Sequence, residues 1–234
     1  MSRNKLDVIK SAQLAAAEKS GSENPYLAGS ELPDAPVDKG SFEHYQAAMS
    51  ADLNSLKALK TLEEKAAAKK TMIETYWGFV NNYVKQGHAY PNDIAVRIMI
   101  WLFDINDIDR GFNLALYLIK QGIHHTPDKF DRDLPTFVCD AMYDWANDLL
   151  KKEQSVDPYL DTLIATIEND NWSLSPPVES KVYAMLAKHK NREGDFAACV
   201  HLCEVAEKVN PEGAGVKSLK ATAFSKLKNS LASA

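Results

Sequence analysis

Apolar residues in this chain recur every three or four positions, and no segment alternates apolar with polar residues as a half-buried strand would. One stretch shows the i, i+4, i+7, i+8 spacing of a single buried helix face: Ile94, Ile98, Trp101 and Leu102. This spacing indicates helices and no sheet. The chain is 234 residues long, which is enough to bury a core without disulfides or metals.

A second helical pattern runs over residues 108–119 and ends before Gly122, and only a short turn through Asn106 separates it from the first. Two helices joined so tightly pack antiparallel, so we expect a helical hairpin. A further helix is indicated over 138–149 by its apolar spacing. Another is indicated after Asp157-Pro158, because proline is favoured in the first turn of a helix. The sequence therefore predicts an all-α fold with helical hairpins.

The segment from Phe42 to Lys70 has apolar residues at an imperfect heptad spacing. A continuous helix over it would be about 42 Å long, longer than most helices of globular proteins, and it needs a surface to pack against. We therefore expect the hairpins to surround one long helix. Its apolar positions are called the seam: Tyr45, Met49, Leu56, Leu59 and Ala66.

The chain is predicted to have three parts. Glycine and proline concentrate between Gly21 and Gly40, so residues 1–41 are expected to be a flexible arm and linker. Residues 42–175 form the predicted helical core, in which 73–175 hold 16 Asp and Glu but 8 Lys and Arg. Residues 176–234 form a C-terminal segment. Within it, a helix pair around Gly194-Asp195-Phe196 resembles a single tetratricopeptide repeat, which we interpret as a packing motif.

Several classes of site are missing from the sequence. There is no GxxxxGK[ST] phosphate loop and no HExxH or HxxxH pair, which disfavours ATP hydrolysis and a zinc enzyme. Cys139, Cys199 and Cys203 have no CxxC spacing and are expected to be core residues. No apolar run is long enough to cross a bilayer, and no secretory signal is recognised. We expect a cytoplasmic protein without a cofactor.

Acidic residues are the abundant candidates for metal chemistry, since Mg²⁺ prefers oxygen ligands. They form three groups: Asp104, Asp107 and Asp109; Asp128, Asp131 and Asp133; and Asp140, Asp144 and Asp148. A magnesium nuclease is one interpretation. The favoured interpretation is structural, with the first group ending one helix and capping the next, and the third group forming a solvated helix face.

Basic residues of the predicted long helix could form a single stripe along it: Lys57, Lys60, Lys65, Lys69 and Lys70. They could contact DNA phosphates, with Arg3, Lys5 and Lys10 of the arm adding further contacts. The alternative is an ordinary solvated face, in which Glu63 and Glu64 offset the charge. Phosphate contacts position a protein without reading sequence, so these lysines predict no particular DNA site.

A series of residues, in this order and spacing, matches one known family. The series consists of Tyr45, Asp52, Leu56-Lys57, Lys65-Ala66, Lys69, Tyr76-Trp77, Val80, Asp93-Ile94, Met99, Trp101, Asp104, Asp107, Ala115, Gly122, Pro135, Phe137, Gly194-Asp195, Ala206 and Gly215-Val216-Lys217. With these residues the chain resembles the small terminase subunits of temperate contractile-tailed phages. They are also called the terminase M protein or the terminase endonuclease subunit.

The resemblance implies a role in DNA packaging and virion assembly in the host cytoplasm. A small terminase subunit recognises the cohesive-end site of double-stranded phage DNA and presents it to a large subunit that holds the ATPase and nuclease. Such subunits commonly form rings, so the seam is expected to join neighbouring copies. We expect no catalysis by this chain itself. The alternative is a helical adaptor that binds proteins and never touches DNA.

Overall fold

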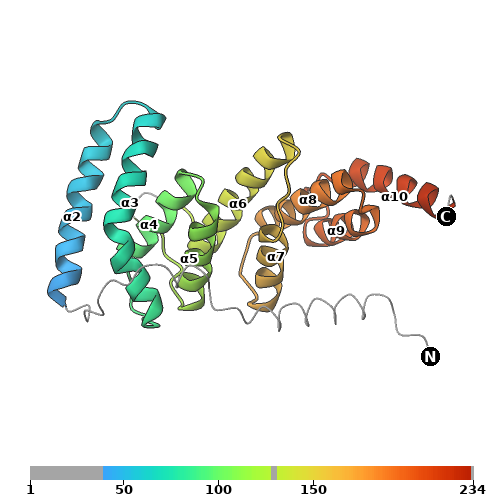
Figure 1. Ribbon diagram of the computed structural model, residues 1–234. Coiled ribbons are helices and arrows are strands. Elements are labelled where there is room, and N and C mark those ends of the chain that lie inside the picture. The colour runs from blue at the N-terminus through green and yellow to red at the C-terminus, as the bar shows by residue number, and fades with distance from the viewer. Residues whose placement is uncertain (1–38, 128–130, 233–234) are drawn as a thin grey trace. The chain divides into compact units, whose positions relative to one another are not determined.

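The computed structural model describes residues 39–127 and 131–232 (Figure 1). Over these ranges the chain forms α-helices and no strand, so the predicted all-α class is confirmed. The helices group into two compact units, one ending at His88 and the other beginning at Ala89. The predicted division at residues 41 and 175 stays a prediction.

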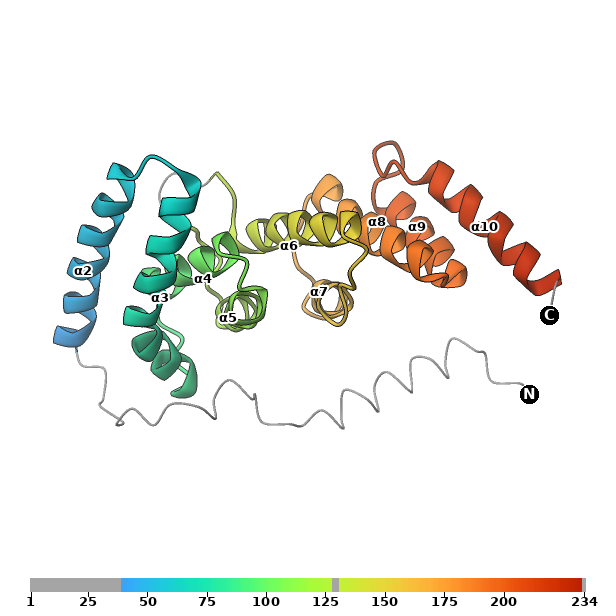
Figure 2. The ribbon, with the colours of Figure 1, turned by 45° about the horizontal axis from the view of Figure 1, so that its top comes forward.

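The described part of the first unit is a hairpin of two helices, α2 (Lys39–Ala58) and α3 (Leu62–Lys85), which lie side by side in Figures 1 and 2. The prediction of one continuous helix from Phe42 to Lys70 is therefore wrong. The helix stops at Ala58 because Thr61 begins a new one with a reciprocal cap. The Thr61 hydroxyl accepts from the Glu64 amide at 3.1 Å, and the Glu64 carboxylate accepts from the Thr61 amide at 3.0 Å.

Aromatic residues hold α2 against α3. The ring of Tyr45 lies 4.7 Å from that of Phe79, measured between centroids. About two turns further along α2, Asp52 accepts a hydrogen bond of 2.6 Å from the hydroxyl of Tyr76. Burial, together with this carboxylate, raises the pKa of Tyr76, so the phenol stays protonated and the bond persists over the physiological pH range.

The second unit begins with the predicted hairpin, formed by α4 (Asp93–Asp104) and α5 (Ile108–Lys120). Asn92 and Asp107 cap these helices by accepting from backbone amides three residues on. The two helices approach closely at Gly111, where an added Cβ would lie 3.2 Å from the Cβ of Leu102. Glycine at this position lets α5 pack directly on α4.

Five more helices complete the second unit. They are α6 (Leu134–Lys151), α7 (Tyr159–Asn169), α8 (Pro176–Glu193), α9 (Phe196–Val209) and α10 (Lys217–Ala232). The start predicted at Asp157-Pro158 is confirmed, since α7 follows it directly. Within this unit α6 packs on α8, α8 packs on α9, and α9 packs on α10.

The helix pair predicted around Gly194 is present as α8 and α9. Gly194 ends α8 with a φ of 85°, a left-handed conformation that glycine adopts without a steric penalty. Asp195 then caps α9 by accepting from the Ala198 amide at 3.0 Å. The likeness of this pair to a tetratricopeptide repeat rests on the sequence alone and stays a prediction.

The three cysteines are buried and unbridged, as expected of core residues. Burial raises the pKa of Cys139 to about 12, and it is also the main cause that raises the pKa of Cys203 to about 12. Burial also raises the pKa of Cys199, so all three thiols are protonated at neutral pH. Among the described helices, none combines the length and the apolar character that crossing a membrane requires.

Candidate functional site

The five lysines of the predicted stripe surround the turn at the tip of the α2–α3 hairpin and are called the tip lysines. Lys57 lies in the last turn of α2, Lys60 lies in the turn between the helices, and the others occupy the first turns of α3. Lys57, Lys60 and Lys70 are exposed, whereas Lys65 and Lys69 are half-buried. The single stripe that the sequence predicted is thus divided by the turn into two groups.

Lys65 and Lys69 are half-buried because of the side of α3 on which they lie. Lys65 and Lys69 are one turn apart on α3, and at 100° per residue they lie on the same side as the fully buried Tyr76. Residues on this side of α3 lie at the packed face of the helix, which accounts for their partial burial. The exposed lysines are the ones best placed to meet a large ligand.

Glu64 caps α3 and keeps its negative charge beside these lysines. Hydrogen bonds from the backbone amides of Thr61 and Lys60 lower the pKa of its carboxyl, and its Oε2 is used by both amides. The carboxylate is thereby committed to capping α3. Of the other predicted DNA contacts, Arg3, Lys5 and Lys10 lie outside the described residues.

The seam residues contribute to packing within one chain. Met49 and Leu56 are only 6% and 7% exposed, and the ring of Tyr45 packs at a tilt against the rings of Tyr76 and Phe79 on α3. Leu59 and Ala66 are half-buried on either side of the turn. A contact between subunits through Met49 and Leu56 would require α2 to leave α3. The seam as a subunit contact stays a prediction.

The first aspartate group acts structurally, as favoured from the sequence. Asp107 caps α5 and also accepts from the guanidinium of Arg110 at 2.8 Å. Asp104 is the last residue of α4. Asp109 accepts a hydrogen bond of 2.9 Å from the hydroxyl of Tyr159, which ties α5 to α7.

The third aspartate group lies in a concave site rather than on a plain solvated face. A cavity of about 710 Å³ runs along α6 and is called the α6 groove. Phe103 and Ile108 from the α4–α5 hairpin form one wall. One face of α6, together with the residue that follows the helix, forms the other wall. From start to end this wall consists of Phe137, Asp140, Ala141, Asp144, Trp145, Asp148, Leu149 and Lys152.

The α6 groove combines acidic and aromatic side chains. Five aspartates but only two basic residues line it, and the aspartates are Asp104, Asp131, Asp140, Asp144 and Asp148. The rings of Phe103 and Phe137 meet edge to face across it, with centroids 5.9 Å apart. Such a surface favours a ligand that is both cationic and apolar.

One aspartate of the groove is held by cations from two other segments. Asp140 forms ion pairs with Arg132, which precedes α6, and with Lys181 of α8. Desolvation, followed by the charge of Arg132, lowers the pKa of Lys181. Sequence spacing could place Asp140 on a face of α6, but it could not indicate partners that are 8 and 41 residues away.

The described residues do not provide a ligand set for a metal ion. Within residues 39–127 and 131–232, no group of three or more His, Cys, Asp or Glu side chains is arranged to hold a metal ion. Asp128 of the second aspartate group lies outside those ranges. Asp133 of the same group caps α6 by accepting from the Thr136 amide at 3.0 Å.

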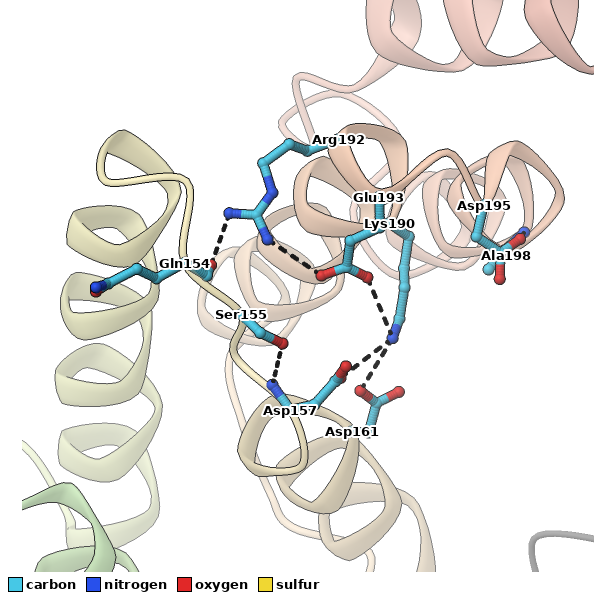
Figure 3. A network of polar contacts seen from close by, with 9 residues as sticks. All are labelled: Gln154, Ser155, Asp157, Asp161, Lys190, Arg192, Glu193, Asp195 and Ala198. Atoms are coloured by element: carbon cyan, nitrogen blue, oxygen red, sulfur yellow. Dashed lines mark hydrogen bonds and ion pairs between the residues drawn. The ribbon is translucent and has the colours of Figure 1, made fainter.

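A second cluster of charges joins the α6–α7 loop to α8 (Figure 3). The ammonium of Lys190 lies 3.3 Å from carboxylate oxygens of both Asp157 and Asp161. Burial acts to lower the pKa of Lys190, but the two carboxylates outweigh it and raise the value. Arg192 donates to the Gln154 carbonyl at 2.6 Å. These contacts explain the cluster as a structural clamp.

One buried titratable group lies between α6 and α8. His189 is fully buried, and its Nε2 is 2.9 Å from the carbonyl oxygen of Ala146. Burial lowers the pKa of His189, so the ring is neutral at pH 7 and donates this bond from Nε2. The sequence contained no signal that distinguished this histidine from the other five.

Comparison with known proteins identifies the family. The sequence model described as phage small terminase subunit matches residues 46–174, more than half of the chain. The chain is 31% identical over 186 residues to a protein of Haemophilus phage HP1 named probable terminase, endonuclease subunit. It is 27% identical over 178 residues to a protein of Escherichia phage P2 named terminase, endonuclease subunit.

These two alignments cover 74% and 75% of this chain, and 65% and 70% of the respective relatives. The chain thus spans about two thirds of the length of these relatives. No solved structure matches it. The matched family region extends from α2 through α7, and so contains the tip lysines and the α6 groove. The chain belongs to the phage small terminase subunit family.

Proposed function

We propose that this protein is the DNA-recognition subunit of a phage packaging terminase. In this proposal it binds the cohesive-end packaging site of double-stranded phage DNA in the host cytoplasm and assembles as an oligomer, such as a ring. It then directs a large terminase subunit to cut and package the genome. ATP hydrolysis and strand cutting belong to that large subunit.

The observation that carries the proposal is the family match over residues 46–174. Two relatives are named as terminase subunits, which supports a role in the same process. The tip lysines supply a surface for the DNA backbone, since three of them are exposed around one turn. Phosphate contacts of this kind give affinity and position, and base contacts elsewhere must supply the site preference.

A second function is favoured by the acidity of the α6 groove. An adaptor that binds only proteins would use such a surface to bind a basic segment of its partner. The net charge of −5 on this chain would also weaken binding to DNA. The two functions differ in one simple respect. The packaging subunit binds cohesive-end DNA more tightly than unrelated DNA, whereas the adaptor has no such preference.

The test is a fluorescence anisotropy titration of the full chain. The labelled duplex comes from the cohesive-end region of the phage that encodes the chain, and the control duplex has the same length and composition in shuffled order. At about 0.1 M salt, where surface charge is only partly screened, we expect at least about tenfold tighter binding of the cohesive-end duplex.

Equal affinity for the two duplexes, or no binding to either, would reject the proposal. A pull-down with the large subunit in the absence of DNA separates the remaining cases. Capture of the large subunit by a chain that ignores DNA would establish the adaptor function.

A further inference from the structure

Helix α10 exposes apolar and basic side chains on one flank. It packs on α9 through the buried Ala223 and an ion pair between Lys220 and Glu207. Phe224 and Leu231, however, are 59% and 72% exposed. At 100° per residue these two lie within about 60° of Lys217 and Lys228, and the four together are called the α10 stripe.

The charge of α10 is of one sign. The helix contains four lysines and no acidic residue. Two of the lysines already interact within the chain, since Lys220 pairs with Glu207 and Lys226 lies 5.2 Å above the ring of Phe196. Lys217 and Lys228 instead flank the exposed Phe224. An exposed large apolar residue between cations is typical of a surface that binds an acidic, apolar groove.

The α6 groove has the complementary chemistry and length. Its aromatic residue Trp145 stands between Asp144 and Asp148 on one face of α6, and Asp148 also forms an exposed ion pair of 2.9 Å with its neighbour Lys151. The groove face runs from Phe137 to Lys152 and is about 22 Å long at about 1.5 Å per residue. The α10 stripe, from the first lysine to Leu231, is about 21 Å long by the same rise. An amphipathic helix lying in an apolar groove is a common mode of recognition.

The stripe and the groove of one chain cannot meet. Helix α10 packs on α9, which packs on α8, and only then does α6 follow. In both ribbon views α10 lies at one end of the second unit, and α4 and α5, which wall the groove, lie at the other (Figures 1 and 2). The groove that α10 reaches must belong to another molecule.

We propose that the α10 stripe of one copy docks in the α6 groove of a second copy. The two surfaces differ, so the contact is head-to-tail. It leaves an open stripe at one end and an open groove at the other, and repeated contacts of this kind close into a ring or extend into a filament. This proposal rests on the oligomeric assembly proposed above and assigns the interface that makes it.

The test is the mass of the full chain by light scattering, measured over a range of protein concentrations without DNA. The wild-type protein is expected to form multimers at higher concentration. K217E/K228E on the stripe and D144K/D148K in the groove should each weaken association by at least about tenfold, since each places like charges in contact. Mixing the two variants pairs each reversed surface with its reversed partner and should restore association.

Two controls make the result specific. K120E/K208E changes the same number of exposed lysines on other helices and should associate as the wild type does. F224S removes the central apolar group of the stripe without a charge change and should also dissociate the multimer. Because Phe224 is largely exposed, that variant should retain the wild-type circular dichroism spectrum and melting temperature.

Two outcomes overturn this interface. One is a wild-type protein that stays monomeric up to about 100 μM, a concentration at which even weak specific contacts assemble. The other is a multimer unaffected by the stripe variants, or one that the mixed variants do not restore. Neither outcome involves DNA, so DNA recognition is judged separately. A chain that assembles through α10 but ignores cohesive-end DNA would refute the proposed function and leave the interface standing.

Discussion

Neutralising the exposed tip lysines is expected to flatten the salt dependence of DNA binding. The variant is K57Q/K60Q/K70Q, which replaces each lysine by a neutral polar side chain and removes three charges. Each phosphate that a protein neutralises contributes about 0.9 to the slope of log affinity against log salt. If all three lysines contact phosphates, the slope falls by about 2.7, and affinity at 0.1 M salt falls by about 500-fold.

The structure favours these three positions because their replacement should leave the fold intact. All three are exposed, and Lys57 donates an exposed hydrogen bond of 3.2 Å to the Asn54 side chain, its neighbour on α2. Substitutions at such positions usually change stability by no more than about 0.5 kcal/mol. A large loss of affinity would therefore report a lost DNA contact and not a misfolded hairpin.

The assay is anisotropy with the cohesive-end duplex at several salt concentrations between about 0.05 and 0.3 M. The matched control is K85Q/K120Q/K208Q, which removes three exposed charges from other positions and should lower the slope much less. If both triple variants gave the same slope, the tip lysines would act only through net charge. The assignment of the hairpin tip as a DNA contact would then be wrong.

Three further predictions concern stability. T61A should lower the free energy of unfolding by about 1 kcal/mol through loss of the helix cap, whereas T61S should retain it; urea unfolding followed by circular dichroism decides. G111V should lower the melting temperature because its side chain meets Leu102, with a cost of about 1 to 3 kcal/mol, and an unchanged melt would contradict the close packing. Burial lowers the pKa of His189 in the folded protein, so protonation of this histidine favours the unfolded chain. The free energy of unfolding should therefore fall as pH drops below the ordinary histidine pKa of about 6.5. H189Q should reduce this loss between pH 7 and 5, and H201Q, at an exposed site, should not.

Most helices of the second unit could be predicted from local sequence signals. Capping residues such as Asn92 and Asp107 bond to amides only three positions away, so the chain needs no distant partner to start a helix there. The apolar periodicity between the caps then determines which face is buried. For this reason the α4–α5 hairpin, the start of α7 and the turn at Gly194 were all predicted.

The break between α2 and α3 was missed although its signal is local. Thr61 and Glu64 have the spacing of a capping box, which marks a helix start. The heptad pattern concealed it, because apolar residues continue at nearly the same spacing on both sides of the short turn. Periodicity detects a buried face, but it does not tell whether one helix or two antiparallel helices provide it.

The sequence by itself determined the all-α class, the helix starts and the residue types of both candidate surfaces, because these depend on neighbours within about one helical turn. Only the tertiary structure decided what those residues do. Packing of α2 on α3 buries Met49 and half-buries Lys65, and the α4–α5 hairpin beside α6 turns a row of aspartates into a groove. Burial and concavity arise when segments far apart in the chain come into contact. Residue spacing describes only neighbours along the chain, so it does not predict those contacts.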